Sequence, residues 1–579
     1  MQVHGLGATT EDDNFVEPNA FEDEILENED QNNVPDQDSK WDDYNWQTDR
    51  LEYNITSEDI RNVPKWHKDA KAAGITRDIN NYDNIDAANL NKKQRIGYDY
   101  VMSHINKKIS DPNNTKPLYL DVSGRAGTGK TYFANCIAKE ANKYVAKFMV
   151  KAAPTGTAAF LIGGHTLHSL FAIPTQRTST KQEIRNLPAE RLRDMQKDFK
   201  DVQLLLIDEK SMVGLYMLYM IDKRLRELKP EAADQPFGGI SVILMGDFAQ
   251  LEPVKDQPLY AKKKDITPMQ EEGRLLFQLF DTTIIFDQQM RQVGEEEQQF
   301  IELLIRVANG ETTKEDWELL KTRELTGDGQ IPPEEQEYIW KHGRKICARN
   351  KDTIAYNQQR IRDLDQAIAK INSENKPNTV EQRILTRSQA NGIPPNVWLA
   401  KGSKVQLTVN EFSDAGLTNG TIGTTIGTIY EENCKPPDIP SMVLVHFPAY
   451  IGKMSYKGME GCWPIIAREQ QWFGKRGQRM WRRGLSLTAA YSNTIHASQG
   501  ASISEPVIIC LEASREFAEG LIYTSLSRVR KFSQLSFYPK VPDYIKWFKN
   551  MKKRPKFRDR LEHEKKQRES DANFFANFD

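Results

Sequence analysis

The stretch Gly124-Arg125-Ala126-Gly127-Thr128-Gly129-Lys130-Thr131 decides the fold because of what precedes and follows it. Residues 117–123 have the apolar pattern of a buried strand, and residues 132–144 have the spacing of a helix. A glycine-rich turn between a strand and a helix is a phosphate-binding loop, or P-loop, whose backbone N–H groups turn inward toward the phosphates. This arrangement predicts an α/β domain with a parallel sheet.

The side chains of the loop have separate predicted roles. Lys130 reaches the outer phosphates, and Thr131 offers its hydroxyl to Mg²⁺. The alternative, a plain glycine-rich turn, leaves the flanking strand and helix unexplained. The predicted nucleotide contacts in this stretch are Gly124, Ala126, Gly127, Thr128, Gly129, Lys130 and Thr131.

Two further strands end in polar residues. Residues 202–207 run into Asp208 and Glu209, which suit metal-assisted phosphoryl transfer: Asp208 holds Mg²⁺, and Glu209 orients and deprotonates the attacking water. Residues 241–245 lead to Gln250, which is positioned to sense the γ-phosphate. Three parallel strands that end at one crevice predict a nucleotide site at the carboxyl edge of the sheet.

Composition sets the outer bounds. A chain of 579 residues with 39% hydrophobic content can bury several cores, so about three to four domains are expected. Five cysteines without a CxxC pair argue against a zinc site and a disulfide framework. There is no secretory signal and no apolar run of about 18 residues. We therefore expect a soluble intracellular protein that binds no membrane, nuclear in a eukaryotic cell and otherwise cytoplasmic or viral.

Charge is unevenly distributed along the chain. Residues 1–60 carry 18 acidic and 2 basic residues, a net charge of −16, whereas the whole chain carries −2 and the remainder therefore +14. An acidic segment of this kind buries too little apolar surface to fold, so we expect residues 1–60 to be disordered and 61–84 to be a linker. The segment either adds solubility or mimics nucleic acid and covers a basic groove.

The other end of the chain is basic. Residues 546–568 contain eleven basic and three acidic residues, and the chain closes on the aromatic run 573–579. Residues 541–579 are therefore predicted to be a basic tail. It is either a solvated helix with a frayed end, or a nucleic-acid contact followed by an aromatic peptide that docks on a protein partner.

Further motifs carry a family resemblance. With the P-loop, the segments that carry it are, in chain order, 90–94, 153–170, 207–212, 221–226, 236–239, 246–254, 289–292, 494–500 and 523–530. In order and spacing they resemble the Pif-one (petite integration frequency) family of superfamily-one helicases. The resemblance covers about residues 85 to 540. It implies two RecA-like domains that use ATP and Mg²⁺ to drive movement along DNA.

The resemblance also implies further nucleotide contacts. Gln94 corresponds to the glutamine that reads adenine through its amide donor and acceptor, which favours ATP. Arg291 and Arg528 correspond to the two arginines that such motors bring to the γ-phosphate across an interdomain cleft, where a bidentate guanidinium suits the developing charge. Gly500 closes the nucleotide site from the second domain.

Contacts to DNA are predicted from both domains. Glycines allow close approach of the backbone, and hydroxyl, imidazole and N–H groups can meet phosphates. The candidates are Thr155, Gly163, His165, Thr166 and His168 in the first domain, and His496, Ser498 and Gln499 in the second. Rings and cations also alternate in 472–476 and 481–483, which indicates either a strand-gripping surface or an aromatic core with a basic rim.

The predicted organisation follows from these motifs. Residues 85–285 form the first RecA-like motor domain, with a duplex-splitting wedge inserted at 172–200. Residues 286–400 and 487–540 form the second RecA-like motor domain. Residues 401–486, rich in short apolar strands, form an inserted SH3-like β-barrel.

The expected activity is that of an ATP-dependent DNA helicase that translocates 5′ to 3′ on single-stranded DNA and opens forked DNA. We expect a monomer in solution. The alternative is a single-strand translocase that displaces proteins or secondary structure without processive unwinding. A catalytically inactive scaffold is disfavoured because the residues predicted for catalysis are all present.

Overall fold

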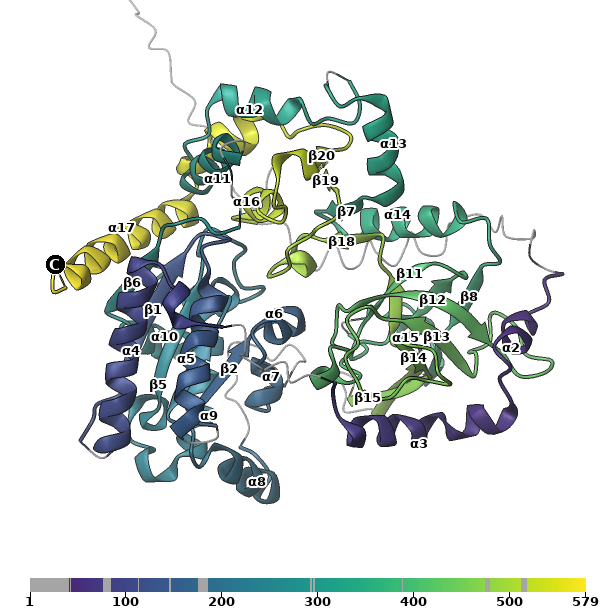
Figure 1. Ribbon diagram of the computed structural model, residues 1–579, viewed down its shortest axis with the longest axis horizontal. Coiled ribbons are helices and arrows are strands. Elements are labelled where there is room, and N and C mark those ends of the chain that lie inside the picture. The colour runs from purple at the N-terminus through teal and green to yellow at the C-terminus, as the bar shows by residue number, and fades with distance from the viewer. Residues whose placement is uncertain are drawn as a thin grey trace, which may run out of the picture.

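The structure is a computed structural model of the whole chain. It describes residues 41–578 apart from 42, 77–84, 113, 145–146, 175–185, 292–293, 295–296, 328, 388, 474–478 and 512–517. Three bodies are visible in Figure 1: a first lobe, a second lobe and a β-rich insert. Of the helices among these residues, none is both long and apolar enough to cross a membrane.

The first lobe is a parallel sheet of six strands flanked by helices (Figure 1). In spatial order the strands are β3 (His165–Thr166), β2 (Met149–Ala153), β4 (Leu204–Ile207), β5 (Ser241–Gly246), β1 (Tyr119–Gly124) and β6 (Thr282–Phe286). The main helices are α4 (Lys92–Ser110), α5 (Lys130–Tyr144), α9 (Leu215–Leu228) and α10 (Pro268–Phe277). Strands β4 and β5 are buried along their whole length, as their unbroken apolar sequence predicts.

The three strands predicted to carry catalytic groups are neighbours. Strand β5 lies between β4 and β1, and both pairings are parallel. Their carboxyl ends therefore meet at one edge of the sheet, which brings together the P-loop, the Asp208-Glu209 pair and the loop that holds Gln250. The predicted parallel sheet, with these three strands ending at one edge, is confirmed.

The second lobe contains a smaller parallel sheet. Its strands, in order, are β18 (Ser492–Thr494), β7 (Arg344–Cys347), β19 (Val507–Cys510) and β20 (Leu535–Phe537). The helices packed around them are α11 (Gln298–Asn309), α12 (Lys314–Lys321), α13 (Pro333–His342), α14 (Asn350–Arg362) and α16 (Leu521–Leu526). Strand β7 is the first of these four strands along the chain. Two parallel sheets of this kind are typical of RecA-like domains.

The insert is built from antiparallel strands. Its largest sheet has the order β14 (Cys462–Ile465), β13 (Met442–His446), β12 (Ile422–Ile429), β11 (Lys404–Leu407) and β17 (Leu487–Ala489). Two small sheets join it, β15 (Arg468–Phe473) with β16 (Arg479–Gly484) and β9 (Glu374–Lys376), and β10 (Asn396–Leu399) with β8 (Ala369–Asn372). Among the described strands, the two end strands β14 and β17 do not pair with each other, so the SH3-like barrel stays a prediction.

The boundaries predicted for the insert are wrong. Strands β8, β9 and β10 precede residue 401, yet β9 pairs with β16, and Ile371 and Leu399 lie in the same apolar core as Val405. Strand β17 follows residue 486 and pairs with β11. The insert therefore covers about residues 369–489, because pairing partners distant in sequence decide to which core a short strand belongs.

The N-terminal prediction is wrong for residues 48–73, which form two helices. They are α2 (Thr48–Glu52) and α3 (Ser57–Ala73), which Figure 1 shows along the edge of the insert. The ring of His67 stacks on Trp463 with centroids 4.6 Å apart, and its Nε2 lies 2.8 Å from the carbonyl oxygen of Pro464. Apolar residues such as Val63 are buried there. Residues 1–40 of the predicted arm lie outside the described residues.

The C-terminal tail also differs from the prediction. Residues 555–575 form one helix, α17 (Pro555–Phe575), which extends from the second lobe past β6 of the first lobe (Figure 1). Phe574 is buried in the core of the first lobe, and its ring lies 5.0 Å from that of Tyr100. The aromatic run therefore packs on its own chain, which contradicts a free peptide that docks on a partner.

The predicted wedge is only partly described. Helix α8 (Ala189–Phe199) lies beside α9, where the amide of Gln196 donates to the Glu227 carbonyl at 2.9 Å. Residues 175–185 lie outside the described residues. The wedge therefore stays a prediction.

Candidate nucleotide site

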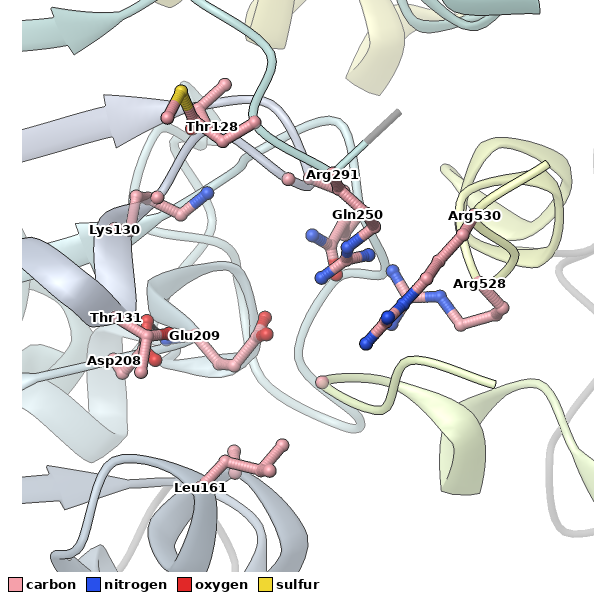
Figure 2. Close-up of a pocket in the computed structure, with 16 residues that line it drawn as sticks. Thr128, Lys130, Thr131, Leu161, Asp208, Glu209, Gln250, Arg291, Arg528 and Arg530 are labelled. Atoms are coloured by element: carbon pink, nitrogen blue, oxygen red, sulfur yellow. Dashed lines mark hydrogen bonds between the residues drawn. The ribbon is translucent and has the colours of Figure 1, made fainter. Parts of the chain in front are cut away.

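A cavity of about 420 Å³ lies between the two lobes. Figure 2 shows Lys130, Thr131, Asp208 and Glu209 along one wall, with the arginines opposite them. The P-loop lines it from Ala126 to Thr131, and Gly500 lines it from the second lobe. This volume falls in the range of small-molecule sites, so the loop, the acidic pair and the arginines share one ligand-sized space.

The P-loop has the geometry expected of it. Gly129 has a φ of +78°, and a Cβ at this position would lie 2.7 Å from Nε2 of Gln94, so only glycine fits. The Lys130 ammonium donates to the carbonyl oxygens of Gly124 at 2.7 Å and Arg125 at 3.0 Å. Burial lowers the pKa of Lys130, against the opposing effect of nearby carboxylates. Lys130 also lines the cavity, where its side chain can meet anionic phosphates.

Gly124 does not line the cavity, unlike the rest of the predicted loop contacts. It ends β1, where a Cβ would lie 2.6 Å from Oγ1 of Thr128 and 2.8 Å from the carbonyl oxygen of Phe286. Gly124 therefore lets the chain turn tightly into the loop, which is a structural contribution to the site.

The two acids after β4 are held differently. The Glu209 backbone N–H donates to Oδ1 of Asp208 at 2.8 Å, and burial together with the Glu209 charge raises the pKa of Asp208. Glu209 itself has a φ of +53°, a left-handed conformation that is uncommon for a residue with a side chain. This turn brings its carboxylate to the cavity, near Gly500, where a Cβ would lie 3.6 Å from Oε1 of Glu209.

The opposite wall carries three arginines, Arg291, Arg528 and Arg530. Arg528 is 2% exposed, and its guanidinium donates to backbone carbonyls, among them Thr524 at 2.8 Å and Ala501 at 3.1 Å. Burial lowers the pKa of Arg528, and burial with the Arg528 charge lowers the pKa of Arg291 to about 10. None of the three forms an ion pair with a described residue, so the wall is suited to a polyanion.

Sequence reasoning missed Arg530, Met290 and Leu161, which also line the cavity. Arg530 follows Arg528 by two residues in the motif 523–530, and that repeated arginine is a signal that could have identified it. Met290 is held at the loop because its backbone N–H donates to the Gly127 carbonyl at 2.9 Å. The apolar Leu161 comes from α6 (Gly156–Leu161) and had no detectable signal.

Gln250 lies in the cavity as predicted. It follows β5 and is 4% exposed, and its Oε1 has no hydrogen-bond partner among the described residues. A buried amide oxygen without a partner is costly unless a ligand or water meets it. Its position in the cavity lining supports a contact between Gln250 and a nucleotide.

Gln94 lies beside the P-loop rather than in the cavity lining. Its Nε2 donates to the Thr128 carbonyl at 2.9 Å, and its Oε1 accepts from the Asn91 N–H at 3.1 Å. Both ends of the amide are therefore occupied by the chain itself. Gln94 contributes to the shape of the loop here, and its reading of adenine stays a proposal.

Two of the predicted DNA contacts in the second lobe are buried. Ser498 is 3% exposed and donates to the Ile495 carbonyl at 2.8 Å. Gln499 is 1% exposed, and its amide donates to Ser211 at 3.0 Å and to Oε2 of Glu209 at 3.4 Å. The structure thus contradicts a surface role for both, and Gln499 instead connects the second lobe to the acidic pair.

The remaining DNA candidates are more accessible. Thr155 and Thr166 begin the short helices α6 and α7 (Leu167–Leu170), His165 is exposed on β3, and His168 is half-buried. Gly163 has a φ of +60° in the turn between them. Figure 1 shows α6 and α7 on the side of the first lobe that faces the insert. His496 is half-buried in the second lobe, and burial lowers its pKa.

The aromatic and basic segment of the insert is partly internal. Trp472 is 7% exposed, and Arg482 is fully buried with its guanidinium bonded to Asn375 at 2.8 Å and to the Gln382 carbonyl at 2.6 Å. Of the two interpretations, the structure supports a core position for these two residues. Residues 474–478 lie outside the described residues.

Known proteins share sequence similarity with this chain. Residues 89–318 match the family model described as PIF1-like helicase. The chain is 27% identical over 446 residues to the ATP-dependent DNA helicase PIF1 of Xenopus laevis, covering 74% of this chain and 61% of that protein. It is 27% identical over 478 residues to the ATP-dependent DNA helicase PIF7 of Trypanosoma brucei brucei, covering 76% and 46% respectively. The chain thus spans between about half and three fifths of these relatives.

A solved structure is similar as well. It concerns DNA unwinding at forked double-stranded DNA by two coordinating Pif1 helicases. It superposes with a TM-score of 0.55 at 25% identity, covering 79% of this chain and 95% of the other. The motif order, the shared fold and the match of sequence agree: this chain is similar to PIF1-like helicases in sequence and in fold.

Proposed function

We propose that this chain is an ATP-dependent DNA helicase that moves 5′ to 3′ along single-stranded DNA and unwinds forked duplex DNA in replication, repair or recombination. One observation supports it above all: the cavity is lined by Lys130 and Glu209 from the first lobe and by Arg528 from the second. Binding of one nucleotide therefore draws the lobes together, and loss of the γ-phosphate releases them. If each lobe grips the strand in only one state, the cycle becomes directed movement.

The residues beside the P-loop fit a divalent cation. Asp208 and Glu209 bring two carboxylates to one wall, Thr131 adds a hydroxyl, and a cation would relieve the unfavourable burial of the Asp208 charge. When bound, Mg²⁺ held by Thr131 and Asp208 would neutralise charge on the phosphates.

The protein groups then divide the chemistry of ATP hydrolysis. Lys130 binds the outer phosphates, and Glu209 orients the attacking water and accepts its proton. Arg291 and Arg528 stabilise the charge that develops on the γ-phosphate, and Gln250 contacts this group. Because the two arginines come from outside the sheet that carries Glu209, hydrolysis requires closed lobes.

DNA is proposed to run across both lobes beside the insert. A second cavity of about 220 Å³ is lined by Asn350, Trp398, Thr494 and Ala497, which combine amide and hydroxyl groups with an aromatic ring. Such a surface suits phosphates and a stacked base. The exposed His165 and its neighbours would continue the path on the first lobe. The SH3-like form of the insert and the wedge at 172–200 belong to this proposal.

A strand-displacement assay tests the proposal. Forks with a 5′ tail or a 3′ tail are mixed with protein, ATP and Mg²⁺, and Lys130→Ala serves as the inactive control. We expect unwinding to require the 5′ tail. We also expect the affinity for single-stranded DNA to fall steeply as the salt concentration rises. Unwinding from the 3′ tail alone would contradict the polarity, and DNA-stimulated hydrolysis without strand separation would identify a translocase.

A further inference from the structure

Helix α17 buries an unusual face. Its buried residues are Phe557, Arg560, Glu564, Gln567, Asp571 and Phe574, which alternate in steps of three and four along one side of the helix. The two ends of this stripe are aromatic, but the four residues between them are polar or charged. Buried polar groups are costly unless they are paired, so their partners indicate what the helix does.

The aromatic ends of α17 lie in different lobes. Phe557 belongs to the apolar core of the second lobe, and Phe574 belongs to that of the first. Near the second lobe, the Arg560 guanidinium donates to the Ala308 carbonyl at 2.5 Å. Near the first lobe, Asp571 accepts from the backbone N–H of Ile285, on edge strand β6, at 2.6 Å. The helix is thus anchored to both lobes, as Figure 1 shows.

Between these anchors, Glu564 pairs with the P-loop itself. Its carboxylate accepts from the Arg125 guanidinium at 3.0 and 3.3 Å, and Arg560 donates to it at 2.6 Å. Burial acts to raise the pKa of Glu564, but the two guanidiniums outweigh burial and hold this pKa at about 2. Glu564 is therefore ionised and charge-paired with Arg125 at neutral pH.

Arg125 is the second residue of the P-loop, and its backbone supports the cavity. Its carbonyl oxygen accepts from the Lys130 ammonium at 3.0 Å and from the Thr128 N–H at 3.3 Å. Its guanidinium also donates to Asp247 at 2.9 Å, and Asp247 in turn accepts from the Tyr523 hydroxyl of the second lobe at 2.8 Å. Fixing the Arg125 side chain therefore fixes the part of the loop on which Lys130 rests.

Gln567 reaches the same region one turn further along α17. Its amide donates to Asp121 at 2.8 Å and to Ser123 at 3.0 Å, both on the strand that leads into the P-loop. The buried ammonium of Lys210, directly after Glu209, donates to the same two side chains. Two adjacent turns of α17 thus contact the base of the nucleotide site.

We propose that Glu564 is a positioning residue for nucleotide binding, which holds the P-loop in its phosphate-accepting shape through Arg125. This inference rests on the proposed use of ATP at the cavity. A helix that served only to stabilise the fold would need no charged contact with the loop, since its aromatic ends already join the two cores. Because α17 is anchored in the second lobe and its Glu564 pairs with Arg125, a shift of that lobe would move the P-loop side chain as well.

The test is a nucleotide affinity measured without DNA. A fluorescent ATP analogue with Mg²⁺ is titrated into the full chain and into Glu564→Gln, which keeps the shape of the side chain and removes its charge. We expect a dissociation constant about tenfold higher, equivalent to about 1.4 kcal/mol. Glu569→Gln, the same change at an exposed position of α17, is the matched control and should leave the constant unchanged.

A double-mutant cycle shows whether Glu564 acts through the loop. In an Arg125→Gln background, Glu564→Gln should weaken binding less than twofold further, because the partner is already lost. With saturating ATP and single-stranded DNA, turnover of Glu564→Gln should stay within about threefold of the parent. The loss should therefore appear as a higher KM for ATP. Additive losses, or a lower melting temperature with unchanged affinity, would overturn the proposal and leave α17 a purely structural helix.

Two further results would also bear on the proposal. If Glu564→Gln is not recovered folded, Glu564→Asp takes its place, with an expected loss of about threefold because the charge is kept but withdrawn by one methylene. An affinity equal to that of the parent would then contradict the proposal. A parent chain that binds the analogue but opens no fork would contradict the proposed helicase function only, since the affinity test does not depend on unwinding.

Discussion

The two walls of the nucleotide cavity differ in charge and in how their side chains are held. On the first lobe, Asp208 and Glu209 follow a buried strand, and the parallel sheet fixes where they lie. On the other side, Arg528 is held by backbone carbonyls and Arg291 lies on the connection between lobes. Each wall lacks the charge that the other supplies, so under the proposed function neither lobe alone would hydrolyse nucleotide at the full rate. The proposed catalysis would thereby depend on the relative position of the lobes.

Removing the arginine wall is expected to have the largest effect. Arg528→Ala should lower DNA-stimulated ATP turnover by about a thousandfold, because the γ-phosphate loses a guanidinium in its transition state. ATP should still bind, since Lys130 and the loop remain. Steady-state hydrolysis and binding of a fluorescent ATP analogue measure the two quantities. Circular dichroism checks the fold, and a loss below tenfold in a folded variant would reduce Arg528 to a structural support.

Changing the acidic wall should cause a smaller loss of ATP turnover. As with Arg528→Ala, ATP binding should be retained while hydrolysis is reduced. Glu209→Gln keeps size and hydrogen bonding but removes the base, so turnover should fall by about a hundredfold or more. Affinity for ATP and for single-stranded DNA should remain. The same change at Glu231, whose exposed carboxylate lies outside the cavity lining, is the matched control. Near-parental hydrolysis by Glu209→Gln would mean that another group is the base.

Sequence motifs predicted the acidic wall well because the information is local. Asp208 and Glu209 directly follow a buried apolar strand. Once that strand pairs in parallel with its neighbours, its carboxyl end lies at the cavity, and the two acids lie there with it. The left-handed backbone of Glu209 was not predictable, since an acidic residue has no special preference for it. The arginine wall was accessible only through family resemblance, because nothing local distinguishes Arg528 from a surface arginine.

The regions that sequence reasoning assigned wrongly depend on distant partners. Gln499 has the composition of a phosphate contact, yet it is buried against Glu209 because the lobes meet there. The charged residues of 555–575 suggested a solvated helix. The sequence pattern does not reveal that Glu564 forms an ion pair with Arg125, which is distant in the chain. The three-four spacing from Phe557 to Phe574 was a readable signal of one buried face. It was hidden by the polar residues in its middle.

Gln499 gives a way to sharpen the comparison of the two walls, since it touches Glu209 from the second lobe. Gln499→Met keeps the volume and removes hydrogen bonds to Ser211 and Glu209. We expect DNA-stimulated turnover to fall about tenfold, the order of one or two lost hydrogen bonds, with the DNA-free rate within threefold. Gln196→Met, on α8 and outside the cavity lining, is the control. Equal losses with and without DNA would show that Gln499 does not couple the lobes.

The smallest catalytic effect is expected at the N-terminal helices, which touch neither wall. Deleting residues 1–40 should change neither melting temperature nor turnover. Deleting residues 1–75 removes α2 and α3, and thus uncovers the insert surface at Trp463 and Met442 that Val63 and its neighbours bury. Loss of several buried apolar side chains should lower the melting temperature by about 5 °C or more. Turnover below the transition should stay within twofold, because the cavity is lined by the lobes. A large drop in turnover at unchanged stability would mean that the insert, with its helices, controls how the two walls close.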